Sequence, residues 1–197
     1  MSPIWIFITD FGDSAVTAPL ALLVLVFLFA AGARRLALAW ALTLGGCAVV
    51  IGMLKLGFGA CGHQLTFVRL VSPSGHTAMS TAVYGSLALL IGVRLPPGQR
   101  RAVLIVAAIA VIVIAVSRVA LHEHSRSEIA VGFAVGVVAV ALFRAALRRH
   151  AAPALPLGWL LLCGGILVAG LHGTRWMIEP ILHRIASDFR LDLPLCR

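Results

Sequence analysis

The chain is 197 residues long, 61% of them are hydrophobic, and its mean hydropathy is +1.05. These values exclude an ordinary soluble domain and are typical of a protein that crosses a membrane several times. The formal net charge of +9 would by itself also suit a nucleic-acid partner, so the placement of the charges along the chain must decide.

The first segment, residues 1–13, is short and mixed. Trp5 and Phe7 alternate with aliphatic residues ahead of two acids, Asp10 and Asp13. The segment lacks the basic start of a secretory signal peptide, so we expect it not to be cleaved. It is typical of a segment that lies along the membrane surface, although a frayed terminus would show the same pattern.

Six apolar runs follow. They cover residues 14–31, 36–54, 77–93, 102–121, 128–143 and 157–171. A helix needs about 20 residues to cross the core of a bilayer, and the runs are close to that length. We therefore expect one all-α domain over residues 1–197, a polytopic membrane bundle of six transmembrane helices.

The last segment, residues 172–197, is polar but carries apolar residues at helical spacing. This pattern predicts an amphipathic helix that lies on the outer leaflet or caps the bundle. Arg175 stands beside Trp176, a pair that suits an anchor at the membrane interface better than a residue of a site.

Three loops between the runs carry arginine and no acid. Their arginines are Arg34 and Arg35, Arg94, Arg100 and Arg101, and Arg144, Arg148 and Arg149. The positive-inside rule makes these loops cytoplasmic and places both termini and all seven acids on the opposite side. The loops carry +8 of the net charge of +9, so topology explains the basic excess. We expect anionic membrane lipids rather than nucleic acid as the partner.

A polar stretch at residues 117–132, SRVALHEHSRSEIAVG, interrupts the apolar runs. If a helix begins near Ser125, His124 and Glu128 stand four residues apart on one face. The carboxylate would then fix the tautomer of the imidazole and leave the other ring nitrogen to act as a nucleophile. Arg118 would offer a planar fork to an oxyanion, above all phosphate. A second interpretation needs no site: Ser125 and Glu128 also fit a capping box, and Arg118 would suit the lipid headgroups.

A second polar stretch, SPSGHTA at residues 72–78, precedes another apolar run. Pro73 followed by small residues is typical of a helix start. The backbone N–H groups of Ser74 and Gly75 would point at an anion, which the helix dipole favours. His76 beside them would donate a proton to a leaving oxygen.

Together the two stretches resemble the type 2 phosphatidic acid phosphatase (PAP2) superfamily, whose membrane members remove phosphate from lipids. The second motif of that family, P-S-G-H, stands at residues 73–76. The third, S-R-x5-H-x3-D, is matched by Ser117, Arg118 and His124, with Glu128 in place of the aspartate. The glycine that often follows is present as Gly132.

The first motif of the family, K-x6-R-P, is only partly present. Lys55 ends an apolar run at the expected place, but Gly62 and His63 stand where the family has Arg-Pro. Either Arg69 substitutes for the missing arginine, or Lys55 and Arg118 hold the phosphate alone. The glycine-rich loop between Lys55 and the second motif would suit a lid over the site or an ordinary interfacial hairpin.

The resemblance implies a phosphatase mechanism that requires no metal or other cofactor. His124, oriented by Glu128, would attack phosphorus and form a phosphohistidine. His76 would protonate the leaving group and later activate the water that hydrolyses the intermediate. Lys55, Arg118 and the start of the second-motif helix would hold the phosphoryl group.

The resemblance also implies a lipid phosphate as substrate. Undecaprenyl pyrophosphate, phosphatidylglycerophosphate, phosphatidic acid and lipid A phosphates all present such an anion at a membrane surface. Small size and family suggest a bacterial inner membrane, and the charge rule then places the site and both termini on its periplasmic side.

Three other functions fit parts of the sequence. A lipid phosphotransferase of the same fold would pass the phosphoryl group to another lipid instead of water. A non-catalytic lipid-phosphate-binding protein would fit the altered first motif. A transporter would carry polar residues in the middle of its spans, whereas here they gather at one end.

The four cysteines fall into two groups. Cys47 and Cys163 stand in the middle of apolar runs and are expected to be small core residues. Cys61 and Cys196 lie on the expected extracytoplasmic side, where a disulfide would tie the C-terminal tail over the site. The spacing of cysteine and histidine does not resemble a zinc site.

Overall fold

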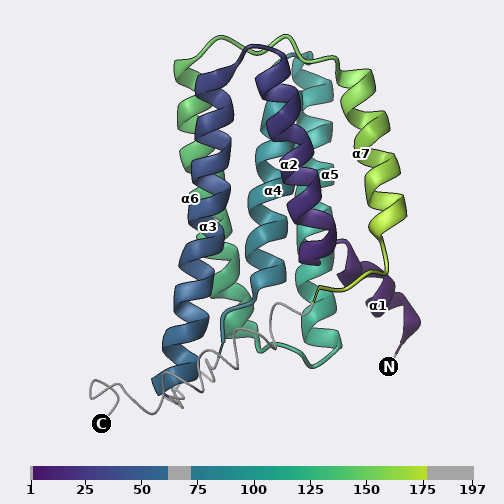
Figure 1. Cartoon of the computed structure of the whole chain (residues 1–197). Helices are drawn as coiled ribbons and strands as arrows, with labels where there is room; N and C mark the ends of the chain where they lie inside the picture. Colours follow the sequence, from purple (N-terminus) through teal and green to yellow (C-terminus); the bar gives the residue numbers. More distant parts are fainter. Residues whose placement is uncertain (1, 62–71, 177–197) are drawn as a thin grey trace.

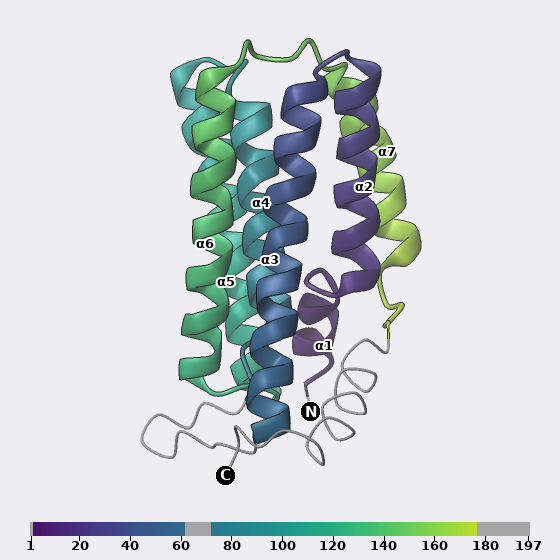
Figure 2. The same ribbon diagram turned by 60° about the vertical axis from the view of Figure 1, so that its left-hand side comes forward.

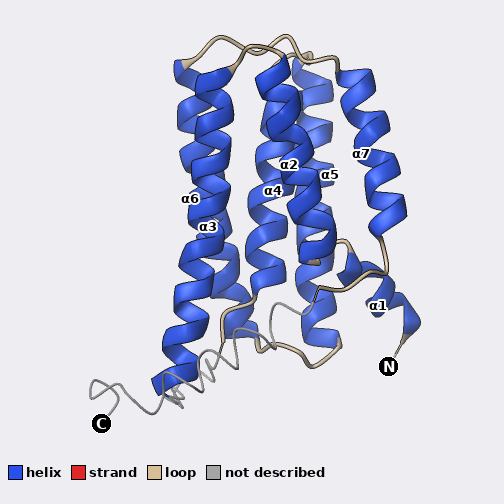
Figure 3. Cartoon of the chain, viewed as in Figure 1, coloured by secondary structure: helices blue, strands red, loops and turns tan. Residues whose placement is uncertain are grey.

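The computed structural model describes residues 2–61 and 72–176, and these residues form helices and no strands (Figure 3). The helices are α1 (Pro3–Asp10), α2 (Ser14–Ala30), α3 (Arg34–Cys61), α4 (Gly75–Gly92), α5 (Pro97–Ala120), α6 (Arg126–Arg149) and α7 (Leu157–Leu171). The all-α fold expected from the apolar runs is confirmed.

Helices α2 to α7 run side by side and alternate in direction, while the short α1 lies across one end of the bundle (Figures 1 and 2). Short connections at residues 31–33, 93–96 and 150–156 join the helices at the other end. Helix α4 contacts α2, α3, α5 and α6 and therefore forms the centre. Because the helices alternate in direction, segments that carry successive motifs lie at the same end of the bundle.

The seam between α4 and α6 is closely packed because small residues face each other there. A Cβ at Gly136 would lie 2.5 Å from Thr81 Cβ and 2.7 Å from the carbonyl oxygen of Ala78. The Thr81 hydroxyl donates to the Thr77 carbonyl oxygen at 2.6 Å, so this buried polar group is satisfied within its own helix. Such small-residue contacts let helix backbones approach in a membrane protein.

Each predicted apolar run forms a helix, and the largest difference lies at the end of α3. The helix continues to Cys61 instead of ending near residue 54, so Lys55 lies within it. Residues 55–61 contain no proline, and glycine only weakens a helix without ending it. The first part of the expected glycine-rich loop is therefore helical. Helix α4 begins at Gly75, two residues earlier than predicted.

Four helical stretches of the described residues are long and apolar enough to cross a membrane: Pro3–Ala30, Arg34–Phe58, Pro97–Ala120 and Arg126–Arg149. Helix α7 is apolar but has only 15 residues, and α4 is not among the four. The chain thus has the character of a membrane protein. The number of six spans, the interfacial role of α1 and the orientation in the membrane stay predictions.

Some predictions fall on residues that the structure does not describe. They are Arg69, the pairing of Cys61 with Cys196, and most of the amphipathic helix over residues 172–197. Cys47 is buried in the core as expected, and Cys163 is half-buried in α7.

Replacing Gly136 with alanine should destabilise the bundle, because the new Cβ would overlap α4. Overpacking of this kind costs about 1–3 kcal/mol, so we expect thermal unfolding in detergent at a lower temperature than for the wild type. Gly45→Ala is the control, since the Cβ position of Gly45 has no described atom within 4 Å. Equal unfolding temperatures for the two variants would contradict a close α4–α6 seam.

Candidate active site

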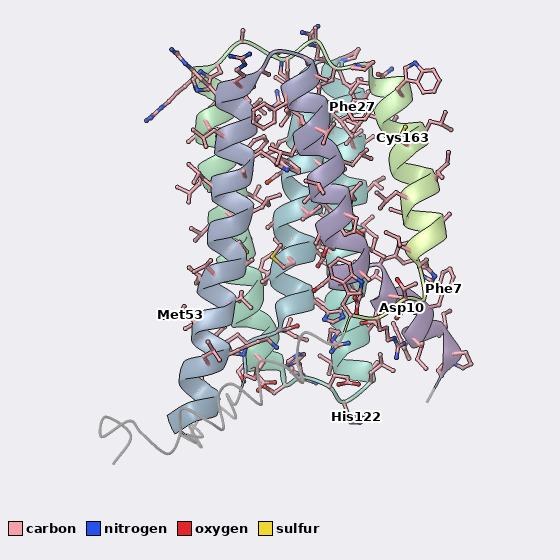
Figure 4. All side chains as sticks on the ribbon, in the orientation of Figure 1. Phe7, Asp10, Phe27, Met53, His122 and Cys163 are labelled. Atoms are coloured by element: carbon pink, nitrogen blue, oxygen red, sulfur yellow. The ribbon has the colours of Figure 1, made fainter. Side chains whose placement is uncertain are left out.

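The motif residues gather at the end of the bundle that carries α1. Lys55 lies near the end of α3, Gly75 starts α4, Arg118 lies in the last turn of α5, and α6 begins just after His124. Figure 4 places the labelled Asp10 of α1 and His122 of the α5–α6 turn at this end, away from Phe27 and Cys163. Segments far apart in the sequence thus meet at one face, as the alternating helices predict.

A cavity of about 600 Å³ opens at this end. Four of the predicted site residues line it, namely Lys55, Gly75, His76 and Arg118. Side chains from both ends of the described chain complete the wall: Thr9, Asp10 and Asp13 before and at the start of α2, and Arg175 and Trp176 after α7. The cavity therefore carries both cationic and acidic groups.

Ser74 caps the first turn of α4. Its hydroxyl oxygen accepts from the Thr77 N–H at 3.4 Å and from the Thr77 hydroxyl at 3.0 Å. Its own N–H donates to the carbonyl oxygen of Glu128 at 3.1 Å. We expected this N–H to face an anion, and that expectation is wrong for this structure: a fully buried N–H needs a partner, and α6 supplies it.

The backbone at Gly75 is the part of this turn that faces the cavity. N–H groups in the first turn of a helix have no partner within the helix, and the dipole there favours an anion. A Cβ at Gly75 would lie 3.5 Å from Cε of Lys55. The lysine side chain thus lies directly beside the start of α4.

His124 and Glu128 form the pair that their spacing predicts. Nδ1 of His124 donates to Oε2 of Glu128 at 3.0 Å, and the two side chains are only 6% and 8% exposed. With Nδ1 held in this way, Nε2 is the ring nitrogen that can act as a nucleophile. His124 does not line the cavity itself; its backbone N–H donates to the carbonyl oxygen of Arg118, which does.

The same glutamate also completes a capping box, so the contacts expected under the two interpretations of this stretch occur together. Oε2 of Glu128 accepts from the Ser125 N–H at 2.9 Å, and the Ser125 hydroxyl accepts from the Glu128 N–H at 3.3 Å. Oε1 accepts from the Ser72 N–H at 2.8 Å. One carboxylate therefore orients the histidine, starts α6 and holds the segment before α4.

Arg118 is 5% exposed, and its guanidinium lies in the wall of the cavity. Nη1 donates to the Thr9 hydroxyl at 3.1 Å, and Nη2 lies 3.8 Å from Oε2 of Glu123. The chain reverses after α5 through His122, whose φ of 57° lies in the left-handed region. This turn brings His124 back beside the arginine that precedes it by six residues.

Two contacts at the site were missed by the sequence analysis. Oδ2 of Asp13 lies 3.4 Å from Nε2 of His76, and Oδ1 of Asp10 accepts from Nε of Arg175 at 3.0 Å. We had placed the first segment on the membrane surface and favoured an anchor for Arg175. The positive-inside rule was the sequence signal that could have indicated these contacts, because it places Asp10 and Asp13 on the same side of the membrane as the motifs.

Comparison with known proteins agrees with the motifs. A model of the PAP2 superfamily matches residues 36–152. A protein of Klebsiella pneumoniae described as an uncharacterized 22.5 kDa protein in the cps region is 33% identical over 129 residues. That alignment covers 65% of this chain and 62% of the relative. No solved structure matches the chain.

The match to the family model takes in Lys55, the start of α4, Arg118, His124 and Glu128. It covers more than half of the chain. The residues that gather at one end of the helical bundle are thus those that carry the motifs, and the chain belongs to the PAP2 superfamily.

Proposed function

We propose that this protein is a lipid phosphatase that hydrolyses a phosphomonoester or pyrophosphate of a lipid through a phosphohistidine intermediate. One observation carries most weight: two buried or half-buried cations, a helix N-terminus and two histidines meet at one end of the bundle beside a cavity whose wall includes charged side chains. Family membership supports phosphatase chemistry at that place.

The phosphoryl group is held by cations and by the start of α4. Lys55 and Arg118 line the cavity with Gly75, and a guanidinium fork binds phosphate oxygens in pairs. The N–H groups at the beginning of α4 add donors, and the helix dipole favours the anion. Ser74 acts through the cap that fixes this turn, and Arg69 stays a further candidate for the clamp.

The chemistry then proceeds in two transfers. Nε2 of His124 attacks phosphorus, the bond to the leaving oxygen breaks, and His76 gives that oxygen a proton. In the second transfer His76 takes a proton from water, and the hydroxyl oxygen displaces His124 from phosphorus. The cationic side chains and the helix N-terminus stabilise the developing negative charge in both transfers, so the mechanism calls for no metal or other cofactor.

The position of the cavity supports a lipid phosphate as the substrate. It opens at the end of an apolar bundle, opposite the arginine-rich loops, where the headgroup of a membrane lipid would present its phosphate. The positive-inside rule supports the extracytoplasmic side for this end, which we propose is the periplasmic face of a bacterial inner membrane. Undecaprenyl pyrophosphate, phosphatidylglycerophosphate, phosphatidic acid and lipid A phosphates are the candidates.

Purified protein should release phosphate from at least one of these lipids in excess EDTA, and His124→Ala should abolish the release. The variant lacks the nucleophile, so it should also fail to form an acid-labile phosphoenzyme from a radiolabelled substrate. His150→Ala is the control, because His150 follows α6 at the opposite end of the bundle. Equal phosphate release by His124→Ala and wild type would exclude the phosphohistidine.

Glu128→Asp should lower activity even though it restores the residue that the family has. The shorter side chain cannot keep the contacts with His124, Ser125 and Ser72, which lie 2.8–3.0 Å from the two carboxylate oxygens. We expect a loss of kcat of about 10²-fold, within the range for acid–base and orienting groups. Unchanged kcat in Glu128→Asp would show that the reach of the glutamate is not needed.

Lys55→Ala should reduce kcat/KM by about 10²- to 10³-fold, as the loss of one donor to a developing anion does elsewhere. Lys55→Arg should recover part of this loss, because a cation beside Gly75 is retained. Steady-state kinetics on the best lipid substrate would measure both. A rate for Lys55→Ala equal to that of the wild type would remove Lys55 from the phosphate clamp.

A further inference from the structure

The junction between α1 and α2 supplies acidic and hydroxyl groups to the cavity, and each contacts a basic side chain of its wall. Thr9 accepts from Arg118, Asp10 from Arg175, and Asp13 lies beside His76. These three side chains belong to residues that are buried. The first segment thus contributes to the site as well as covering the end of the bundle.

The junction is fixed from several sides. The rings of Phe7 and Phe11 each lie 4.4 Å from the ring of His172, which follows α7. The Tyr84 hydroxyl of α4 donates to the carbonyl oxygen of Phe11 at 2.5 Å. A Cβ at Gly12 would lie 2.7 Å from Cγ2 of Ile114 in α5. Helices α4 and α5 and the residue after α7 therefore set the position of Asp13.

The two carboxylate oxygens of Asp13 do different things. Oδ1 accepts from the Ala15 N–H at 2.8 Å and so caps α2; it also accepts from the Trp176 N–H at 3.4 Å. Oδ2 lies 3.4 Å from Nε2 of His76. Capping of α2 accounts for the Ala15 contact of Oδ1. It does not account for the contact of Oδ2 with His76, which points to a second role for Asp13.

We infer that Asp13 is the positioning residue of the proton donor His76, an inference that rests on the proposed function. Oδ2 of Asp13 accepts from Nε2 of His76 and fixes the ring. The proton given to the leaving oxygen then comes from Nδ1, and Nδ1 later takes the proton of the attacking water. Each histidine of the site is in this way paired with one buried carboxylate, His124 through Nδ1 and His76 through Nε2.

The pair of Asp13 and His76 also affects the balance of charge in the cavity. A protonated His76 would be the fourth positive charge in a wall that already holds Lys55, Arg118 and Arg175. Asp10 is engaged by Arg175, and Glu123 lies at 3.8 Å from Arg118. Asp13 is the described acid in contact with His76, and its charge offsets that of the imidazolium.

The test uses two substrates that differ in how much they need a proton donor. A short-chain phosphatidic acid has an alkoxide leaving group that must be protonated, whereas the p-nitrophenolate of p-nitrophenyl phosphate leaves without a proton. The ratio of kcat/KM for the two reports the first transfer alone, because hydrolysis of the phosphohistidine follows it. Asp13→Asn and Asp13→Ser both keep a good N-cap for α2 while removing the carboxylate.

In both variants we expect kcat/KM for the phosphatidic acid to fall by about 10- to 10²-fold, a part of the 10²- to 10⁴-fold that a proton donor contributes, with little change for p-nitrophenyl phosphate. Asp10→Asn is the matched control: it removes a buried carboxylate of the same junction that contacts Arg175, and it should change both rates by the same factor. In a His76→Ala background, Asp13→Asn should have no further effect on the ratio.

Equal losses on the two substrates in both Asp13 variants, or additive effects with His76→Ala, would overturn the inference and reduce Asp13 to a helix cap. Such a result would leave the proposed function standing, because the wild type would still release phosphate. A wild type that releases no phosphate from either substrate or from the lipid panel would instead overturn the proposed function and the inference with it.

Discussion

The carboxylate of Glu128 is the group on which the arrangement of the site depends. A buried carboxylate is costly unless hydrogen bonds satisfy it, and here His124, Ser125 and Ser72 supply them. The backbone adds a further link, since the Ser74 N–H donates to the carbonyl oxygen of the same residue. Moving Glu128 would therefore displace His124 and the start of α4 together, although the two motifs belong to separate helices.

That link requires α6 to lie almost against the start of α4, and glycine makes the approach possible. A Cβ at Gly132 would overlap the carbonyl oxygen of Ser74, the same oxygen that accepts from Ala78 in the first turn of α4. The close packing of α6 on the second motif thus requires a glycine at position 132, which follows the third motif. The two motifs therefore form one structural unit, in which the absence of a side chain at Gly132 allows α6 to approach the start of α4.

Hydrophobic runs made the helices predictable, and local spacing made part of the site predictable. His124 and Glu128 stand four residues apart across the start of α6, and this spacing makes their contact predictable from the sequence. Helix α3 is longer than predicted because the prediction used the end of the apolar run. The length of an apolar run indicates the extent of the membrane core, whereas a helix ends where its backbone hydrogen bonding stops. The contacts of Asp13 and Asp10 join segments far apart in the chain, and no periodicity encodes such a contact before the fold is known.

Those long-range contacts join the region that matches the family model to segments of the chain outside it. The matched region, residues 36–152, contains the motif residues Lys55, His76, Arg118 and His124. Thr9, Asp10, Asp13 and Arg175 line the same cavity and all lie outside that region. The buried guanidinium of Arg118 needs a hydrogen-bond acceptor whether or not substrate is present, and Thr9 of the first segment supplies one. The family match therefore covers the motif residues, while the two ends of the described chain contribute to the shape and the charge of the cavity beside them.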